Sequence, residues 1–147
     1  DIARALKIHS KILLLGHGTE DGLLACSGGY RFGRYIVDGS HKTLLSGKNK
    51  SVWSIWCNSD RYFNSISDKQ TGIHTSMIIS EISEEIAIFG RVILPAVSLK
   101  QNMKMFSEAF RYNLDFYNPI VAQKQILEMY QGDDEVTYYN RERILVF

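Results

Sequence analysis

The chain has 147 residues, of which 45% are hydrophobic and 22% charged, and its formal net charge at pH 7 is +1. This length suits one domain with a sizeable core, and the composition is ordinary for a globular protein. A charge so near zero gives no strong field for nucleic acid or anionic lipid, and no apolar run approaches the roughly 20 residues that span a bilayer, so we expect neither partner.

The N-terminal residues and the cysteine content indicate the compartment. The opening residues, DIARALKIHS, lack the apolar stretch of about 7–15 residues that a signal peptide needs before its cleavage site. Two cysteines, Cys26 and Cys57, are too few for a disulfide framework in so small a chain. We therefore expect a reduced, cytoplasmic protein.

The first part of the chain predicts two buried strands with a hairpin between them. Residues 12–15 form a continuous apolar run, which fits a strand buried on both faces, as in a parallel sheet. Residues 23–26 and 30–37 flank a Gly-Gly turn and predict a hairpin that Asp38 and Gly39 close. Residues 41–50 have room for one helical turn around Leu44 and Leu45, and residues 52–56, VWSIW, predict the second buried strand.

The rest of the chain predicts a loop, three helices and two short strands. Residues 58–72 form a polar loop of the kind that lines sites. Apolar residues with helical spacing predict a helix over 75–89 that Gly90 ends, Ser98 is a candidate N-cap for a helix over 99–114, and Asn118 and Pro119 begin a helix that reaches about residue 130. Residues 136–139 and 144–147 are strand candidates. With no repeat or linker, this order predicts one α/β domain over residues 1–147.

A histidine and a cysteine each stand just beyond an apolar strand. His17 follows the first strand in ILLLGHG, and Cys57 ends VWSIWC. Open α/β sheets place their sites at the carboxyl ends of strands, so two adjacent parallel strands would bring these residues together. A histidine beside a cysteine can take the thiol proton and so activate the nucleophile. The backbone N–H groups of Gly18 and Cys57 could then stabilise a developing oxyanion.

An apolar block ending in His-Gly, then a hairpin, then an apolar block ending in Cys resembles the caspase-like cysteine peptidases, which include caspases, legumain, gingipains, clostripain and separase. The resemblance covers residues 11–59, about a third of the chain. It implies a three-layer α/β sandwich with a short, mostly parallel sheet, a hairpin after the His strand and helices on the faces. It also implies that His17 is the general acid/base and Cys57 the nucleophile that cleaves peptide or protein substrates through a thioester, without a cofactor.

The chain departs from the pattern of this family in two ways. Members usually have a βαβα unit before the His strand, whereas about eleven residues precede it here, so we expect an abbreviated sheet or missing upstream strands. Cys57 is followed by Asn-Ser-Asp, in which Asp60 is unusual. Asp60 could face a basic substrate side chain or cap the following turn, and Trp56 could shape a substrate pocket or pack in the core.

Other interpretations of the same residues remain open. A short sheet could serve as a non-catalytic caspase-like interaction or regulatory module, with homo-oligomerisation supplying the missing surface. Cys26 is expected to be structural, and His74 to be a surface residue or a cap partner. The histidines outside the proposed dyad lack metal-ligand spacing, so we expect no metal. GHGT also matches a fragment of tetrapyrrole chelatases, but the chain continues as a hairpin instead of a helix, and the full phosphate-binding glycine patterns are missing.

Overall fold

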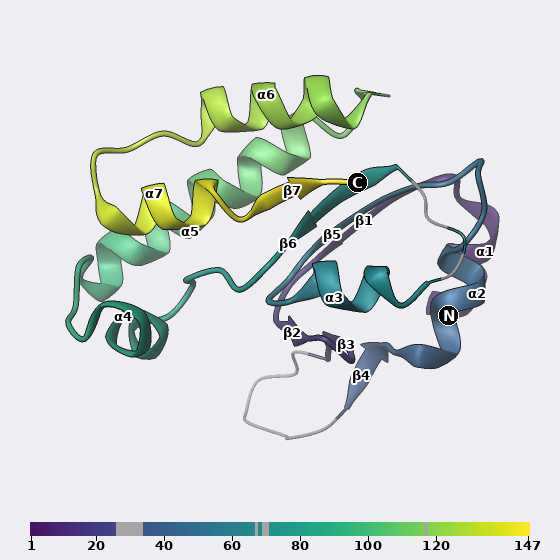
Figure 1. Cartoon of the computed structure of the whole chain (residues 1–147), viewed down its shortest axis with the longest axis horizontal. Helices are drawn as coiled ribbons and strands as arrows, with labels where there is room; N and C mark the ends of the chain where they lie inside the picture. The colour runs from purple at the N-terminus through teal and green to yellow at the C-terminus, as the bar shows by residue number, and fades with distance from the viewer. Residues whose placement is uncertain (26–33, 67, 69–70, 117) are drawn as a thin grey trace. The chain divides into compact units, whose positions relative to one another are not determined.

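The computed structural model describes residues 1–25, 34–66, 68, 71–116 and 118–147. These ranges contain seven α-helices and two β-sheets, and the larger sheet is mixed but mostly parallel, which confirms the α/β class (Figure 1). The chain divides into two compact units, which are described separately below. The first comprises Asp1–Met77 with Leu145–Phe147, and the second comprises Ile78–Ile144.

The larger sheet has the strand order β1-β5-β6-β7. Strands β1 (Lys11–Leu15), β5 (Ser51–Ile55) and β6 (Gly72–Thr75) are parallel, with β5 between the other two. Strand β7 (Ile144–Val146) lies beside β6. Gly72 and Phe147 exchange both backbone hydrogen bonds, at 2.9 and 3.0 Å, which is the pattern of an antiparallel pair. The apolar runs at residues 12–15 and 52–56 thus give strands, as expected, but only β5 is buried on both faces, because Leu15 of β1 is exposed.

The smaller sheet is the expected hairpin with one additional strand. Strands β2 (Gly18–Thr19), β3 (Gly22–Leu24) and β4 (Tyr35–Val37) pair antiparallel in that order. Residues 26–33, which include Cys26, lie outside the described residues, so the expectation for this cysteine is untested.

Short helices cover one face of the larger sheet in the first unit. They are α1 (Ile2–Ile8), α2 (Lys42–Leu45), which follows a 3₁₀ turn over Gly39–His41, and α3 (Ser59–Asn64). Their inward side chains join strand residues in one apolar core, made of Leu6, Ile12, Leu14, Leu23, Val37, Leu45, Val52, Trp56, Tyr62, Phe63 and Ile66. Lys50 links α1 to α2, because its ammonium group donates to the carbonyl oxygens of Leu6 and Leu44.

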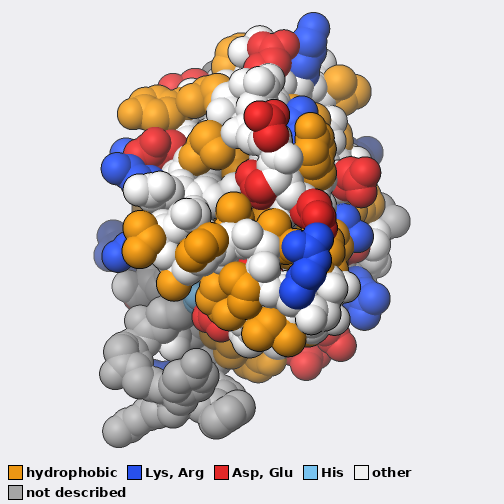
Figure 2. Space-filling view, turned by 90° about the vertical axis from the view of Figure 1, so that its left-hand side faces the viewer, with side chains coloured by type: hydrophobic (Ala, Val, Ile, Leu, Met, Phe, Trp, Pro, Cys, Tyr) orange, Lys and Arg blue, Asp and Glu red, His pale blue; other side chains and the backbone are white. Residues whose placement is uncertain are grey.

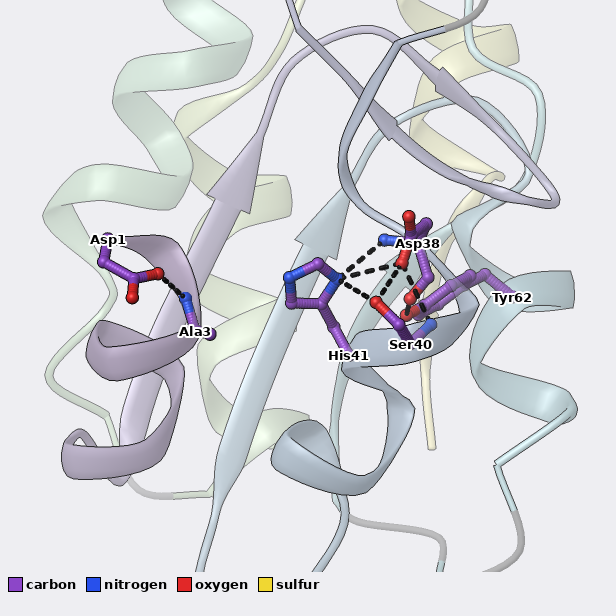
Figure 3. Close-up of polar contacts among 6 residues, drawn as sticks. All are labelled: Asp1, Ala3, Asp38, Ser40, His41 and Tyr62. Atoms are coloured by element: carbon purple, nitrogen blue, oxygen red, sulfur yellow. Dashed lines mark hydrogen bonds and ion pairs between the residues drawn. The ribbon is translucent and has the colours of Figure 1, made fainter.

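Asp38 ends the hairpin and connects it to α3 (Figure 3). Its carboxylate accepts from the backbone N–H of Ser40 at 2.9 Å and from the Ser40 hydroxyl at 2.6 Å, and His41 Nδ1 lies 3.1 Å away. These hydrogen bonds from Ser40 hold the pKa of the Asp38 carboxyl below its usual value. The Tyr62 hydroxyl donates to the Asp38 carbonyl oxygen at 2.6 Å, and burial raises the pKa of this phenol.

Three expectations for residues 58–89 are wrong. Residues 59–64 form helix α3 instead of a loop, because Tyr62 and Phe63 bury their rings in the core while Arg61 and Asn64 are exposed. The expected helix over 75–89 begins only at Ile82, since the preceding residues supply the end of strand β6 and a non-helical segment. His74 is therefore a β6 residue with only 2% of its surface exposed, where it stacks on Phe63, and not a surface residue.

The second unit consists of four helices. They are α4 (Ile82–Phe89), α5 (Ala96–Tyr112), α6 (Pro119–Met129) and α7 (Glu135–Arg141). Asn118 and Pro119 begin α6, and Gly90 ends α4 in a left-handed conformation with φ 74°, both as expected. Helix α5 starts before Ser98, since Leu99 N–H already bonds to Pro95 O at 2.9 Å.

The expected strand over residues 136–139 is instead helix α7. Asp134 caps it by accepting from the backbone N–H of Thr137 at 2.8 Å and from the Thr137 hydroxyl at 2.7 Å. Asn140 of this helix holds Ile79, whose N–H and carbonyl bond to the Asn140 amide at 2.7 and 2.9 Å. Figure 2 shows hydrophobic side chains interspersed with side chains of both charges on one face of the molecule.

Candidate active site

His17 and Cys57 stand at equivalent positions beyond two paired strands. In the parallel pairing of β1 with β5, Leu15 lies opposite Ile55. His17 and Cys57 each follow their strand by two residues, and the pairing continues through Gly16, whose N–H bonds to Ile55 O at 3.1 Å. Neighbouring strands lie about 4.8 Å apart, so the ends of β1 and β5, which the two residues follow, lie side by side at one edge of the sheet. His17 is exposed and Cys57 is half-buried.

Cys57 occupies a tight turn between β5 and α3. The N–H of Ser59 bonds to the carbonyl oxygen of Trp56 at 3.1 Å, which closes a four-residue turn. Asn58 has φ 64° and ψ 27°, in the left-handed region, which asparagine tolerates better than most residues. The chain therefore changes direction sharply at Asn58. Cys57 is the second residue of this turn, two residues before helix α3 begins.

The Trp56 ring connects this turn to β2. Its Nε1 donates to the carbonyl oxygen of Thr19 at 2.9 Å. Gly18 lies directly against the ring, because a Cβ atom built on Gly18 would come within 2.3 Å of Trp56 Cδ1. The indole itself is fully buried, so it contributes to the site by holding Gly18 and Thr19 in place. The segment after His17 and the segment before Cys57 are thus joined by direct contact.

The amide of Gly18 points away from its partner strand. Gly18 lies opposite Leu23, and the N–H of Leu24 bonds to His17 O at 2.8 Å. In an antiparallel ladder this makes Gly18 and Leu23 a non-hydrogen-bonded pair, whose N–H groups face outward. Because β2 is the edge strand of its sheet, the Gly18 N–H points away from that sheet. This direction suits a donor to an oxyanion.

Asp60 lies in the first turn of α3, next to the Cys57 turn. Its Oδ1 atom is shielded from solvent and accepts no hydrogen bond from the part of the chain that the structure describes. Asp60 does not occupy the N-cap position, which belongs to Asn58. A carboxylate oxygen without a donor is costly to bury, so its position beside a candidate nucleophile suggests a role that packing does not explain.

Small polar side chains that the sequence analysis did not select brace the Cys57 turn against β6. The Thr75 hydroxyl donates to Trp56 O at 2.9 Å, and the Thr75 N–H donates to Ser59 Oγ at 2.9 Å. Both residues are fully buried. The sequence offered no signal for Ser59, which stands in the polar stretch after Cys57, and little for Thr75, which follows Ile73 and His74. Their partners lie 16 to 19 residues away, and the sequence does not identify them.

The other histidines lie apart from any metal-binding arrangement. The described residues contain no group of three or more His, Cys, Asp or Glu side chains that could hold a metal ion. His74 contacts the Ser54 hydroxyl through Nδ1, and burial lowers the pKa of its ring to about 3. His41 belongs to the Asp38 turn.

Across the described ranges, no helix is long and apolar enough to cross a membrane. Comparisons of the chain with protein-family models, curated proteins and solved structures gave no match.

Proposed function

We propose that this chain is a caspase-like cysteine peptidase in which His17 and Cys57 form the catalytic dyad. The observation that carries the proposal is the register of β1 and β5, which gives the two residues equivalent positions at one sheet edge. The contacts of the Trp56 ring with Gly18 and Thr19 support it independently, because they join the same two segments. The order of parallel strand, hairpin and parallel strand also agrees with the resemblance noted above.

In the proposed reaction the Cys57 thiolate attacks the carbonyl carbon of a peptide bond, after its proton has passed to His17. The amides of Gly18 and Cys57 donate to the oxyanion that forms. The C–N bond then breaks, the amine leaves with the proton from His17, and the acyl group remains on Cys57 as a thioester. A water molecule that gives a proton to His17 hydrolyses this thioester to a carboxylic acid, and the thiol is restored.

Asp60 supports a preference for substrates with a basic side chain beside the cleaved bond. The residue as a whole is only half-buried, in the first turn of α3 next to the Cys57 turn, and a lysine or arginine side chain would supply donors to its carboxylate. The change Asp60→Asn should then lower kcat/KM for peptides with arginine before the cleaved bond by about 10-fold or more, while peptides with leucine there should be little affected.

Selective acylation of Cys57 tests the dyad. We expect an activated acyl probe to modify Cys57 faster than Cys26, as located by peptide mass mapping, with a pH profile that gives the thiol a pKa well below the ordinary value of about 8.5. The variants Cys57→Ala and His17→Asn should abolish this fast reaction, and Cys26→Ala is the matched control that should retain it.

One result would overturn the peptidase proposal. If Cys57 reacts as an ordinary thiol and His17→Asn leaves its rate and pH profile unchanged, no dyad exists. The non-catalytic interaction module would then be the better account of this fold.

A further inference from the structure

Thr75 lies at the end of β6 and reaches the peptide unit that carries the candidate oxyanion donor. Its hydroxyl donates to the carbonyl oxygen of Trp56 at 2.9 Å. That carbonyl and the N–H of Cys57 belong to the same planar peptide unit, in which they point in opposite directions. Whatever fixes the carbonyl therefore fixes the direction of the Cys57 N–H.

We infer that Thr75 is a positioning residue that aims the Cys57 amide at the oxyanion. The inference rests on the proposed function, since it assumes acyl transfer at Cys57. Thr75 itself touches no substrate in this account, because it is fully buried. It acts through the carbonyl of Trp56 alone.

Thr75 is held firmly enough to serve as an anchor. Its N–H donates to Ser59 Oγ at 2.9 Å, and Ser59 Oγ in turn donates to the Ser54 carbonyl oxygen at 2.5 Å. A β-branched side chain also has few rotamers, so the hydroxyl loses little freedom when it bonds. The turn is thereby tied to two parallel strands of the sheet, β5 through Ser54 and β6 through Thr75.

Two donors meet at the Trp56 oxygen, which has two lone pairs. The Ser59 N–H occupies one at 3.1 Å and the Thr75 hydroxyl occupies the other. A carbonyl that accepts hydrogen bonds polarises its peptide unit, and this strengthens the N–H at the other end as a donor. The Thr75 hydroxyl thus fixes the direction of the Cys57 N–H and also makes it a stronger hydrogen-bond donor.

The second candidate oxyanion amide has the same arrangement. The N–H of Gly18 shares its peptide unit with the carbonyl of His17, and that carbonyl accepts from Leu24 N–H at 2.8 Å. The donor to the His17 carbonyl is a backbone N–H, which a substitution cannot remove. One of the two donors to the Trp56 carbonyl is the Thr75 side chain, so its effect on the reaction at Cys57 can be measured by substitution.

The experiment compares two reactions of Cys57 that differ in whether an oxyanion forms. Acylation by a p-nitrophenyl ester passes through a tetrahedral oxyanion, whereas alkylation by iodoacetamide is a displacement at a saturated carbon. We expect Thr75→Val and Thr75→Ala to slow acylation by about 10- to 100-fold, less than the loss of a whole oxyanion donor, with alkylation within about twofold of the wild-type rate. The alanine variant is needed because the added methyl group of valine would press on the Trp56 oxygen.

Two further variants complete the comparison. Thr75→Ser retains the hydroxyl and should react like the wild type in both assays. Thr137→Val removes another fully buried threonine hydroxyl, from helix α7, and should leave both rates unchanged. The ratio of the two rates cancels any difference in the amount of folded protein.

Three outcomes would overturn the inference. Acylation of Thr75→Ala within about twofold of wild type would show that the hydroxyl does not aim the amide. An equal fall in acylation and alkylation would show that Thr75 supports the thiolate or the fold instead. If the wild-type protein is not acylated at Cys57, the proposed function fails and this inference falls with it, whereas the first two outcomes leave the peptidase proposal standing.

Discussion

Gly18→Ala tests how tightly β2 packs against the Trp56 ring. A Cβ atom at position 18 would lie 2.3 Å from Trp56 Cδ1, 2.4 Å from the carbonyl oxygen of Gly22 and 2.7 Å from Trp56 Cγ. Carbon atoms do not approach one another, or a carbonyl oxygen, this closely without repulsion. The buried ring cannot swing aside, and the Gly22 oxygen is backbone. We therefore expect β2 to move away from Trp56.

The free-energy cost of moving β2 follows from the contacts that are lost. Overpacking costs about 1–3 kcal/mol, and loss of the hydrogen bond from Trp56 Nε1 to Thr19 O leaves a buried donor unsatisfied for a further 1–3 kcal/mol or so. Alanine recovers about 0.4–1 kcal/mol, because it restricts the unfolded chain. We expect a net loss of about 1–5 kcal/mol in the free energy of unfolding.

Urea denaturation followed by far-UV circular dichroism measures this change. Gly39→Ala is the matched control, because nothing lies within 4 Å of a Cβ at that position, and it should show only the gain of about 0.4–1 kcal/mol that comes from restricting the unfolded chain. A Gly18→Ala midpoint within the error of the control would refute the packing argument. It would show that β2 can leave the Trp56 ring at little cost.

Three further predictions concern the turn, the buried histidine and the second unit. Asn58→Gly should be neutral or slightly stabilising in urea denaturation, whereas Asn58→Val should cost about 1–2 kcal/mol, because valine does not tolerate a φ of 64°; equal midpoints would contradict this. The folded pKa of His74, about 3, lies below its unfolded value of about 6.5, so between these values the unfolded chain binds a proton that the folded chain does not. Stability should therefore fall by about 1 kcal/mol per pH unit from pH 6 to pH 4, and His74→Gln should show a shallower slope, while parallel slopes would exclude this linkage. Asn140→Ala should destabilise the protein by about 2–4 kcal/mol, since the N–H and carbonyl of Ile79 both lose their partner, and amide hydrogen exchange at Ile79 should accelerate.

Burial along single runs made part of the fold predictable. The runs at residues 12–15 and 52–56 form strands because apolar runs this short fit a strand better than a helix, and β5 is indeed buried on both faces, whereas β1 buries only Ile12 and Leu14. Asn118 and Pro119 begin α6 because a cap and a fixed φ are local properties. Such features can be predicted because they are determined by a few residues that are adjacent in the sequence.

Elements whose partners are distant could not be predicted. Residues 77–79 match a helical stripe in composition, but Ile79 is not helical, since the Asn140 side chain supplies its hydrogen bonds from 61 residues away. Residues 136–139 are β-branched and aromatic like a strand, but burial of Val136 and the Asp134 cap favour helix α7. Helix α3 has only six residues, too few for a periodic pattern. In each case tertiary contacts override local preference.

In the candidate site, too, only part of the arrangement could be predicted from the sequence. That His17 and Cys57 follow the ends of neighbouring strands was predictable, because it depends only on the two strands being adjacent and parallel. The register itself is less well encoded, since residues 12–15 are all apolar and either face of β1 could be buried. The contact of Gly18 with Trp56 supplies the missing constraint. A shift of β1 and β2 by one residue would place His17 or Thr19 against the indole, where not even a Cβ atom fits. A residue without a side chain therefore determines the register of β2 against the Trp56 ring.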